Sequence, residues 1–519
     1  MSCNDSTVVP TVASKQLPKV MKMTQSVQLL LLLPFILAIC AVISADPHVV
    51  NYLPGYQGHL PFTLETGYVG VGESEEVQLF YYFVESERDV ATDPLMLWLT
   101  GGPGCSAFNG LVFEIGPFTF DYDATSDSGS DIPMLRLNPY SWTKVASIIF
   151  LDSPVGTGFS YATTYEGYHS NDTLQSSHIY QFLRKWLTNH PNFRTSPLYI
   201  SGDSYAGQIV PIIVQQILTG NHPNLFCVLS SFTRFRLSTV LQSGNQVGLV
   251  PKMDLKGYVI GNPSTVGNKR KNSQIQFLHR VSLVSDELYR LAKLSCNGDY
   301  VNIDATNIKC LRALAAIEEV TTSINNPHIL ETKCLSVSPK LPMKVPTYKD
   351  DHVDSFIFGE RQLENSFCRN QNYLLSYIWL DNIQVRKALN IREGTVDHWV
   401  RCNNSLAYTN DFQTSVVGYH QNLTNKYLQV LVYSGDQDNA VPYIGTLEWI
   451  EELKVATAEE WRPWFVDGQV AGYVTEFGSF AYQYHLVYTT IKGAGHTAPE
   501  YKPKECLAMI ERWFELSPL

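Results

Sequence analysis

Short apolar stretches alternate with amphipathic stretches along most of the chain. The apolar stretches have the length of buried strands and end at turn residues. We expect strands at 76–85, 95–99, 147–151, 198–201, 257–260, 428–433 and 485–491. Helical spacing is found at 172–187, 382–389 and 503–514. This alternation predicts an α/β fold, in which helices cover both faces of a central, mostly parallel sheet.

The alternation fades between residues 263 and 372, where four of the cysteines cluster. We interpret this stretch as an inserted cap domain that is stapled by disulfides and covers a pocket. It divides the core into a first part, 46–262, and a second part, 373–519. Within the first part, residues 222–245 contain no acidic residue and no clear period. They are either an insertion from an unspliced intron or a surface loop.

Residues 1–45 form an N-terminal extension that contains an apolar run at 29–43. Lysines precede this run, and the small residues Ser44 and Ala45 follow it. This pattern is typical of a secretory signal peptide that is cleaved near Ala45. The run is too short, and polar residues follow too soon, for a stable membrane anchor.

The chain has 519 residues, a net charge of -11 and no cluster of basic residues, which argues against nucleic-acid binding. Its ten cysteines indicate disulfides in an exported protein. No cysteine or histidine group has zinc spacing, and no nucleotide or haem motif is present, so we expect neither metal nor cofactor. Acceptor triplets predict N-glycosylation at Asn171, Asn403 and Asn422.

A candidate nucleophile, Ser204, lies in the turn Gly202-Asp203-Ser204-Tyr205-Ala206-Gly207, between an expected strand and an amphipathic run. Asp436 and His496 follow the ends of two later strands. Serine, aspartate and histidine in this chain order are typical of the catalytic triad of α/β-hydrolases. His496 would take the serine proton, and Asp436 would orient the imidazole. Asp438 competes for the second role, but the position directly after Gly435 favours Asp436.

An oxyanion site is expected next to the nucleophile. The segment 98–106, Trp-Leu-Thr-Gly-Gly-Pro-Gly-Cys-Ser, offers backbone N–H groups that side chains do not shield. We expect the donors to be the N–H groups of Gly102 and of Tyr205, the residue after the nucleophile. The loss of one such donor typically costs about 3 kcal/mol of transition-state stabilisation.

Six motifs occur in a fixed order along the chain: WLTGGPGCS, LDSPVGTGFSY, GDSYAGQIVP, GYVIGNP, YSGDQD and KGAGHTAPEYKP. Together they resemble the plant serine carboxypeptidase-like family from about Tyr52 to Leu519, except at residues 222–245. The resemblance implies the α/β-hydrolase fold and places the family's triad on Ser204, Asp436 and His496.

The resemblance also implies disulfides, which would join Cys105 to Cys402, Cys296 to Cys310, and Cys334 to Cys368. Relatives commonly have a further cysteine near Val320, which this chain lacks. The pairing within the cap therefore stays open.

Thr100, Gly101 and Asp203 are the expected substrate-binding positions. Carboxypeptidases of the family bind the terminal carboxylate of a peptide with Asn at the first position and Glu at the third. Threonine lacks the amide, and the aspartate side chain is one methylene shorter. Together with Ser153, these substitutions resemble the acyltransferase branch of the family.

Membership of that branch implies transfer of an acyl group, phenolic by resemblance, from a 1-O-β-glucose ester to an alcohol or amine. The expected partners are a small-molecule acyl donor and acceptor. The resemblance also implies residence in the vacuole or outside the cell. The alternatives are a serine carboxypeptidase and a non-catalytic relative that acts as a binding or scaffold protein.

Overall fold

The computed structural model describes residues 47–122, 132–219, 251–334, 368–412, 415–478 and 484–519. A sheet of 12 strands runs through this part of the chain in the order β1-β2-β3-β7-β4-β10-β11-β13-β16-β15-β14, with β8 paired to β3. Its strands are β1 (His48–Val49), β2 (Leu64–Val71), β3 (Val77–Val84), β4 (Leu95–Leu99), β7 (Ser147–Leu151), β8 (Tyr161–Ala162), β10 (Leu198–Asp203), β11 (Leu255–Gly261), β13 (Leu428–Gly435), β14 (Thr457–Val466), β15 (Gln469–Gly478) and β16 (Tyr484–Ile491).

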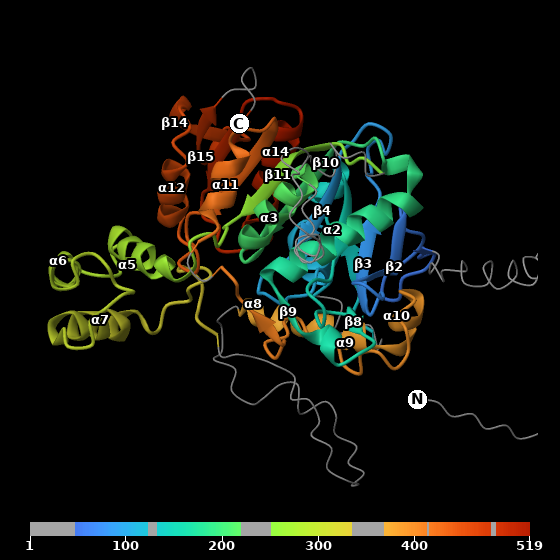
Figure 1. Cartoon of the computed structure of the whole chain (residues 1–519), viewed down its shortest axis with the longest axis horizontal. Coiled ribbons are helices and arrows are strands. Elements are labelled where there is room, and N and C mark those ends of the chain that lie inside the picture. Colours follow the sequence, from blue (N-terminus) through green and yellow to red (C-terminus); the bar gives the residue numbers. More distant parts are fainter. Residues whose placement is uncertain (1–46, 123–131, 220–250, 335–367, 413–414, 479–483) are drawn as a thin grey trace, which may run out of the picture. The chain divides into compact units, whose positions relative to one another are not determined.

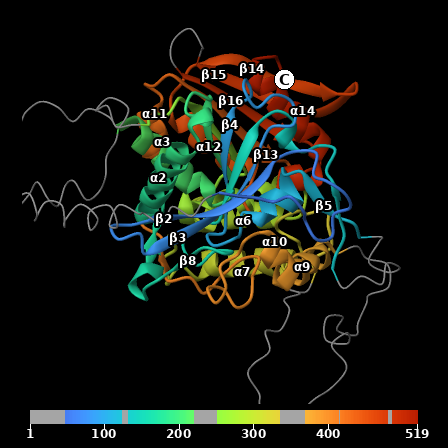
Figure 2. The same ribbon diagram turned by 90° about the vertical axis from the view of Figure 1, so that its right-hand side faces the viewer.

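The six central strands, β7, β4, β10, β11, β13 and β16, run parallel to one another. The outer strands on both sides pair antiparallel, and β2 and β3 lie at the opposite end of the sheet from β14 and β15 (Figure 2). All the strands expected from the apolar runs are therefore confirmed, and the sheet is mixed, with the expected parallel strands at its centre and antiparallel strands on both sides. Two further pairs lie outside this sheet: β5 (Phe118–Phe120) with β6 (Leu135–Leu137), and β9 (Ser170–Asn171) with β12 (Tyr408–Thr409).

The expected helices are confirmed as α2 (Asp172–Asn189), α10 (Ile383–Ala388) and α14 (Pro503–Phe514). The other α-helices of the described chain are α3 (Ala206–Thr219), α5 (Arg270–Arg280), α6 (Asp286–Ser295), α7 (Ile308–Thr321), α8 (Arg369–Asn372), α9 (Leu374–Asp381), α11 (Val417–Leu423), α12 (Tyr443–Glu452) and α13 (Ala498–Tyr501). The described residues also form the π-helix η1 (Gly110–Glu114) and the short 3₁₀ helices η3 (Trp142–Lys144), η4 (Glu166–Tyr168), η5 (Pro191–Phe193) and η6 (Gly267–Lys269).

Two hydrophobic cores lie on the two faces of the sheet because successive side chains of a strand point to opposite sides. In β4, Leu95, Leu97 and Leu99 join one core, and Met96 and Trp98 join the other. The first core contains apolar residues of α2, α3 and α12, and the second those of η1, α9 and α14. Figure 1 shows α2 and α3 in front of the strands. Because the central strands are parallel, their carboxyl ends lie at the same edge of the sheet, where ligand sites of such folds are found.

Helices α5, α6 and α7 belong to the stretch that we interpret as a cap. They share a separate hydrophobic cluster, which contains Ile275, Ala292 and Ile317. A disulfide from Cys296 to Cys310 links the end of α6 to α7. Figure 1 shows these three helices grouped beside the strands. The bounds of the cap, 263–372, stay a prediction.

Two of the expected segments, 1–45 and 222–245, lie outside the described residues. Within the described ranges, no helix combines the length and the apolar character needed to cross a membrane. The same residues contain no group of three or more metal-ligating side chains suited to an ion.

Candidate active site

Ser204 occupies a sharp turn between β10 and α3. Its backbone has φ +54°, which is unusual for a residue other than glycine and is typical of a strained nucleophile turn. Small neighbours make this turn possible. A Cβ atom on Gly202 would lie 2.3 Å from the carbonyl oxygen of Leu99 and 2.6 Å from the Cβ of Ala206. The alanine at position 206 therefore fits only because Gly202 has no side chain.

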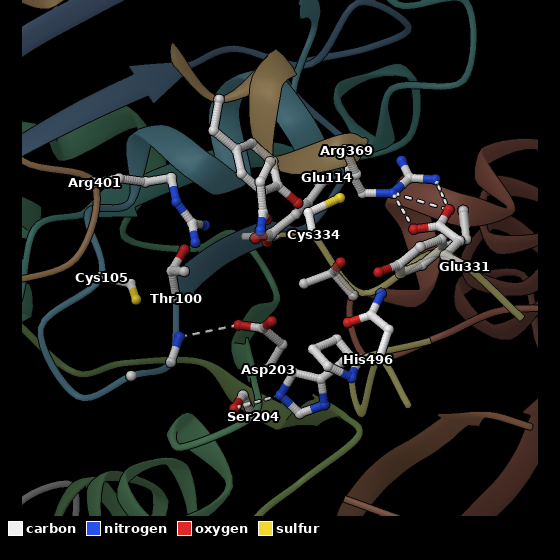
Figure 3. A pocket seen from close by; sticks show the side chains of 18 of the residues that line it. Thr100, Cys105, Glu114, Asp203, Ser204, Glu331, Cys334, Arg369, Arg401 and His496 are labelled. Carbon is white, nitrogen blue, oxygen red and sulfur yellow. Dashed lines mark hydrogen bonds and ion pairs between the residues drawn. The ribbon is translucent and has the colours of Figure 1, made fainter. Parts of the chain in front are cut away.

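A chain of hydrogen bonds runs from Ser204 through His496 to Asp438. The His496 Nε2 atom lies 2.8 Å from Ser204 Oγ, and its Nδ1 atom lies 2.7 Å from Asp438 Oδ2. Figure 3 shows the imidazole facing the serine. The expected approach of Ser204 and His496 is thus found, but the expected role of Asp436 is wrong.

The Asp436 side chain does not reach the imidazole, because its backbone is still bonded to the neighbouring strand β16. Its N–H donates to the carbonyl of Ile491, and its Oδ1 accepts from the N–H of Gly493 at 2.7 Å. The chain then turns, and Asp438, two residues later, reaches the imidazole. Proximity to Gly435 was therefore a poor guide to the direction of the side chain.

Asp438 is fully buried and is held from several sides. The side-chain amide of Asn262 donates to Oδ2 at 2.7 Å. The N–H groups of Ala440 and Val441 donate to Oδ1 at 2.6 and 3.1 Å. Such bonds compensate for the burial of a carboxylate and fix its direction. Asn262, in the motif GYVIGNP, was not identified from the sequence, although its place after a strand end was a usable signal.

The pKa of His496 reflects two opposing effects. Burial alone would lower it, but the hydrogen-bonded Asp438 carboxylate, with a smaller contribution from Asp203, raises it above the ordinary value of 6.5. A raised pKa makes the imidazole a stronger proton acceptor in its neutral form.

The glycine-rich segment lies directly against the nucleophile. A Cβ atom on Gly101 would lie 2.6 Å from Ser204 Cβ and 2.7 Å from the Tyr205 nitrogen, so only glycine fits there. The N–H of Gly101 donates to Asp203 Oδ1 at 3.0 Å. Within the described residues, the N–H groups of Gly102 and Tyr205 have no protein acceptor. Both expected oxyanion donors are therefore available to a ligand.

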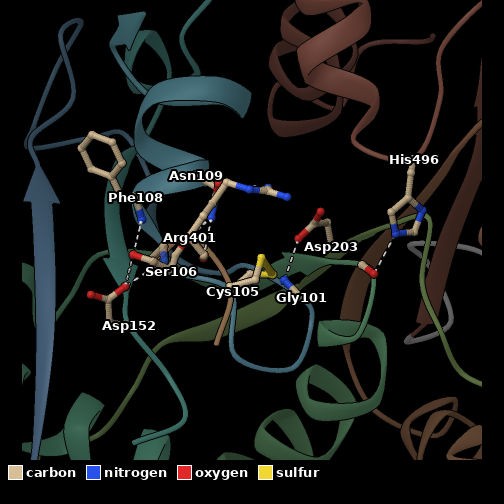
Figure 4. Close-up of a disulfide and its surroundings, with 12 residues drawn as sticks. Gly101, Cys105, Ser106, Phe108, Asn109, Asp152, Asp203, Arg401 and His496 are labelled. Carbon is tan, nitrogen blue, oxygen red and sulfur yellow. Dashed lines mark hydrogen bonds between the residues drawn. A yellow bond between two sulfur atoms is a disulfide. The ribbon is translucent and has the colours of Figure 1, made fainter. Parts of the chain in front are cut away.

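Further bonds hold this segment in place (Figure 4). The expected disulfide from Cys105 to Cys402 is confirmed, as are the other two expected pairings, Cys296–Cys310 and Cys334–Cys368. The carboxyl group of Asp152 accepts hydrogen bonds from Ser106 Oγ at 2.7 Å and from the backbone N–H of Ala107 at 2.8 Å.

Two buried carboxyl groups lie beside this segment. Burial raises the pKa of Asp203 to about 6, against the opposing effects of His496 and the N–H of Gly101. Burial also raises the pKa of Glu114 well above its usual range, and the neighbouring Asp203 adds to this effect. Glu114 was not identified from the sequence because it lies in an apolar run and reaches the site only through the fold.

These groups line a cavity of about 240 Å³. Thr100, Asp203, Ser204 and His496 form part of its wall, together with Glu114. Two buried oxygen atoms of the wall, Thr100 Oγ1 and Glu114 Oε2, have no hydrogen-bond partner in the described chain. Unpaired buried polar atoms of this kind are expected where a ligand supplies the missing bonds.

The opposite wall is built by a salt-bridged cluster (Figure 3). Arg369 donates to both oxygens of Glu331 and to Glu500 Oε1, and its guanidinium lies 4.2 Å from the ring centre of Tyr501. The disulfide from Cys334 to Cys368 joins neighbours of Glu331 and Arg369. The stretch interpreted as a cap therefore contributes Glu331 and Arg369 to the cavity wall, although the sequence did not single out these two residues.

The glycosylation sites stay predictions. At Asn403, the side-chain nitrogen to which a glycan would be attached already donates a hydrogen bond to the carbonyl of Gly156 at 2.9 Å. The nitrogen of Asn422 has only a long contact, 3.4 Å, with Gln215.

The chain is similar to known proteins over most of its length. The family model described as serine carboxypeptidase matches residues 54–516. Serine carboxypeptidase-like 1 of Arabidopsis thaliana is 41% identical over 471 residues, which cover 91% of this chain and 93% of the relative. Serine carboxypeptidase-like 7 of the same plant is 39% identical and covers 91% and 94%.

One solved structure is similar in fold. Kex1(Δ)p, a prohormone-processing carboxypeptidase from Saccharomyces cerevisiae, superimposes with a TM-score of 0.61 and 18% identity. The match covers 88% of this chain and 91% of the yeast chain. It supports the α/β-hydrolase fold and carries no information on the substrate.

The first prediction concerns the choice between the two aspartates. Asp438→Asn removes the charge that stabilises the imidazolium and favours the wrong tautomer, so kcat for ester cleavage should fall by about 10⁴-fold. Asp436→Asn is the matched control, since its carboxyl group binds the N–H of Gly493 and the side chain of Gln437 rather than the imidazole, and it should retain activity within a fewfold of the wild type. The reverse ranking would contradict the hydrogen-bond geometry.

The second prediction concerns pH. His496 accepts the serine proton only when neutral, so kcat/KM should fall as the pH drops through its raised pKa. The midpoint of this acid limb should therefore lie above pH 6.5, the ordinary value for histidine. Residual activity of Asp438→Asn should show a lower midpoint, and Asp436→Asn should leave it in place. A midpoint that does not respond to Asp438→Asn would exclude this pairing as the cause.

Proposed function

Because the chain belongs to the serine carboxypeptidase family, we propose that Ser204 forms an acyl-enzyme and that the acyl group then passes to an alcohol or amine. The proposed donor is a 1-O-β-glucose ester with a phenolic acyl group. One observation supports the choice of acyl transfer: Asp203 Oδ1 is already bonded to the N–H of Gly101, and the neighbouring position 100 is a threonine. This part of the cavity is a poor match for a peptide's terminal carboxylate.

The proposed reaction has two half-reactions that use the same residues. Ser204 Oγ attacks the ester carbonyl while its proton passes to His496 Nε2. The bond to the glucose oxygen then breaks, and that oxygen takes the proton from His496. An acceptor hydroxyl next gives its proton to His496 and attacks the acyl carbonyl. The bond between this carbonyl and Ser204 Oγ then breaks, and Oγ takes the proton from His496, which releases the ester product and restores Ser204. In both steps the N–H groups of Gly102 and Tyr205 are proposed to hold the negative carbonyl oxygen.

The acceptor must compete with water, which is far more concentrated. Alignment of the acceptor next to His496 is worth several kcal/mol when the reacting atoms are held in position. The cavity wall that contains the Arg369–Glu331–Glu500 cluster provides a fixed surface for such alignment.

A serine carboxypeptidase is the second candidate, and a specific observation favours it. The raised pKa values of Asp203 and Glu114 leave both carboxyl groups increasingly neutral at acidic pH. A neutral carboxyl group donates a hydrogen bond to a carboxylate, which is the interaction that a peptide terminus needs.

Entry into the secretory pathway is part of the proposal. Its support is chemical: disulfides persist in exported proteins, and three join described cysteines. The vacuole and the cell exterior are the proposed destinations.

The third prediction tests the proposed reaction with two substrates. Purified protein is given a glucose ester with an alcohol acceptor, and separately a peptide with a free carboxyl terminus. We expect acyl transfer to exceed release of terminal residues, with Ser204→Ala inactive on both substrates. Faster release of terminal residues would favour the carboxypeptidase.

The fourth prediction addresses the two substitutions. Thr100→Asn with Asp203→Glu restores the pair that carboxypeptidases of the family use. Each charged hydrogen bond contributes about 1.5–3 kcal/mol, so peptidase kcat/KM should rise by about ten- to thousandfold. The same double variant should lose activity toward the glucose ester. An unchanged peptidase rate would contradict the proposed basis of substrate choice.

A further inference from the structure

We propose that Asp172, outside the cavity wall, is a positioning residue for the oxyanion site. It connects Tyr205, which supplies one proposed oxyanion donor, to the segment 402–412, which holds the loop that supplies the other. This inference rests on the proposed serine chemistry, but it applies equally to acyl transfer and to hydrolysis.

Asp172 is fully buried at the start of α2 and accepts bonds on both carboxyl oxygens. Its Oδ1 accepts from the hydroxyl groups of Tyr205 and Tyr408, each at 2.7 Å. Its Oδ2 accepts from the N–H groups of Asp411 and Phe412 at 2.7 and 3.2 Å. A buried carboxylate with this many donors forms short, directional bonds and resists displacement.

The segment 402–412 reaches the glycine-rich loop at its other end. Cys402 is bonded to Cys105 by the disulfide. The N–H of Asn403 donates to the carbonyl of Gly104 at 2.8 Å, and the N–H of Ser106 donates to the carbonyl of residue 401 at the same distance. Figure 4 shows the disulfide beside Gly101 and Asp203. The loop that contains Gly102 is thus fixed to this segment covalently and by backbone bonds.

The same segment is fixed to α2 by backbone pairing. Strand β12 (Tyr408–Thr409) pairs in parallel with β9 (Ser170–Asn171), immediately before Asp172. Both proposed donors are therefore connected to one short stretch of chain, residues 170–172. Gly102 is connected through the disulfide, and Tyr205 through its hydroxyl and Asp172.

This arrangement bears on catalysis because an oxyanion donor acts only at the correct position. The backbone N–H of Tyr205 belongs to the peptide group that follows Ser204, which is already strained at φ +54°. Anchoring the tyrosine hydroxyl restricts movement of that peptide group. Displacement by about 1 Å can cost on the order of 100-fold in rate.

The test uses Tyr205→Phe, which removes the hydroxyl and retains the backbone donor and the ring. Tyr199→Phe is the matched control, because Tyr199 lies on β10 and its hydroxyl binds Gln429 Oε1 at 2.5 Å, away from the cavity. Each protein is assayed with a p-nitrophenyl ester. The affinity of each protein is then measured for two ligands. One is an arylboronic acid, which forms a tetrahedral adduct with the serine, and the other is the planar carboxylic acid product.

We expect Tyr205→Phe to lower kcat by about 10- to 100-fold with KM within a factor of two. Affinity for the boronic acid should fall by a similar factor, and affinity for the planar acid should stay unchanged. Tyr199→Phe should match the wild type in all three measurements. Asp172→Asn, which preserves the glycosylation triplet, should resemble Tyr205→Phe.

Wild-type kcat and boronic acid affinity in Tyr205→Phe would overturn the inference, even if Asp172→Asn failed to fold. Equal losses in Tyr199→Phe would also overturn it, because they would indicate a general loss of stability. Ester turnover without transfer from a glucose ester would contradict the proposed function alone. A wild-type protein that neither turns over the ester nor binds the boronic acid would overturn both.

Discussion

The hydrogen bond between the His496 imidazole and the buried carboxylate of Asp438 determines how the rest of the site can work. It joins the segments that follow two parallel strands, β13 and β16, and directs the other imidazole nitrogen toward Ser204, which follows a third strand, β10. Burial opposes a charged histidine, whereas the carboxylate favours it. The bonds from Asn262 and the turn after Asp438 keep that carboxylate in place, since a buried charge without partners is costly.

Ser204 and the glycine-rich segment pack so closely that a side chain at position 101 would clash with the Ser204 turn. Gly101 touches the Ser204 turn, and its N–H is bonded to the side chain of Asp203. The same aspartate thus supports the loop and takes part in the buried carboxyl pair with Glu114. Substitution at position 203 is therefore expected to alter both the geometry of this segment and the choice of substrate.

Sequence reasoning identified the parts of this architecture that are encoded locally. Short apolar runs predicted the strands, and the glycine-rich turns that follow them pointed to Ser204 and His496, because the carboxyl ends of parallel strands converge. The disulfide pairings came from family resemblance. What it missed depends on how the chain turns after a strand or on contacts across long distances. Asp438 replaces Asp436 because of one turn, and Glu114 and the Arg369 cluster reach the cavity only after folding.

Intact-protein mass spectrometry after rapid quenching with a glucose ester tests whether Ser204 carries the acyl group. We expect one acyl mass to be added without acceptor, to map to the peptide containing Ser204, and to disappear when an alcohol acceptor yields an equal amount of ester. Ester formation without any adduct on Ser204, or an adduct that yields only free acid when the acceptor is added, would contradict acyl transfer through this serine.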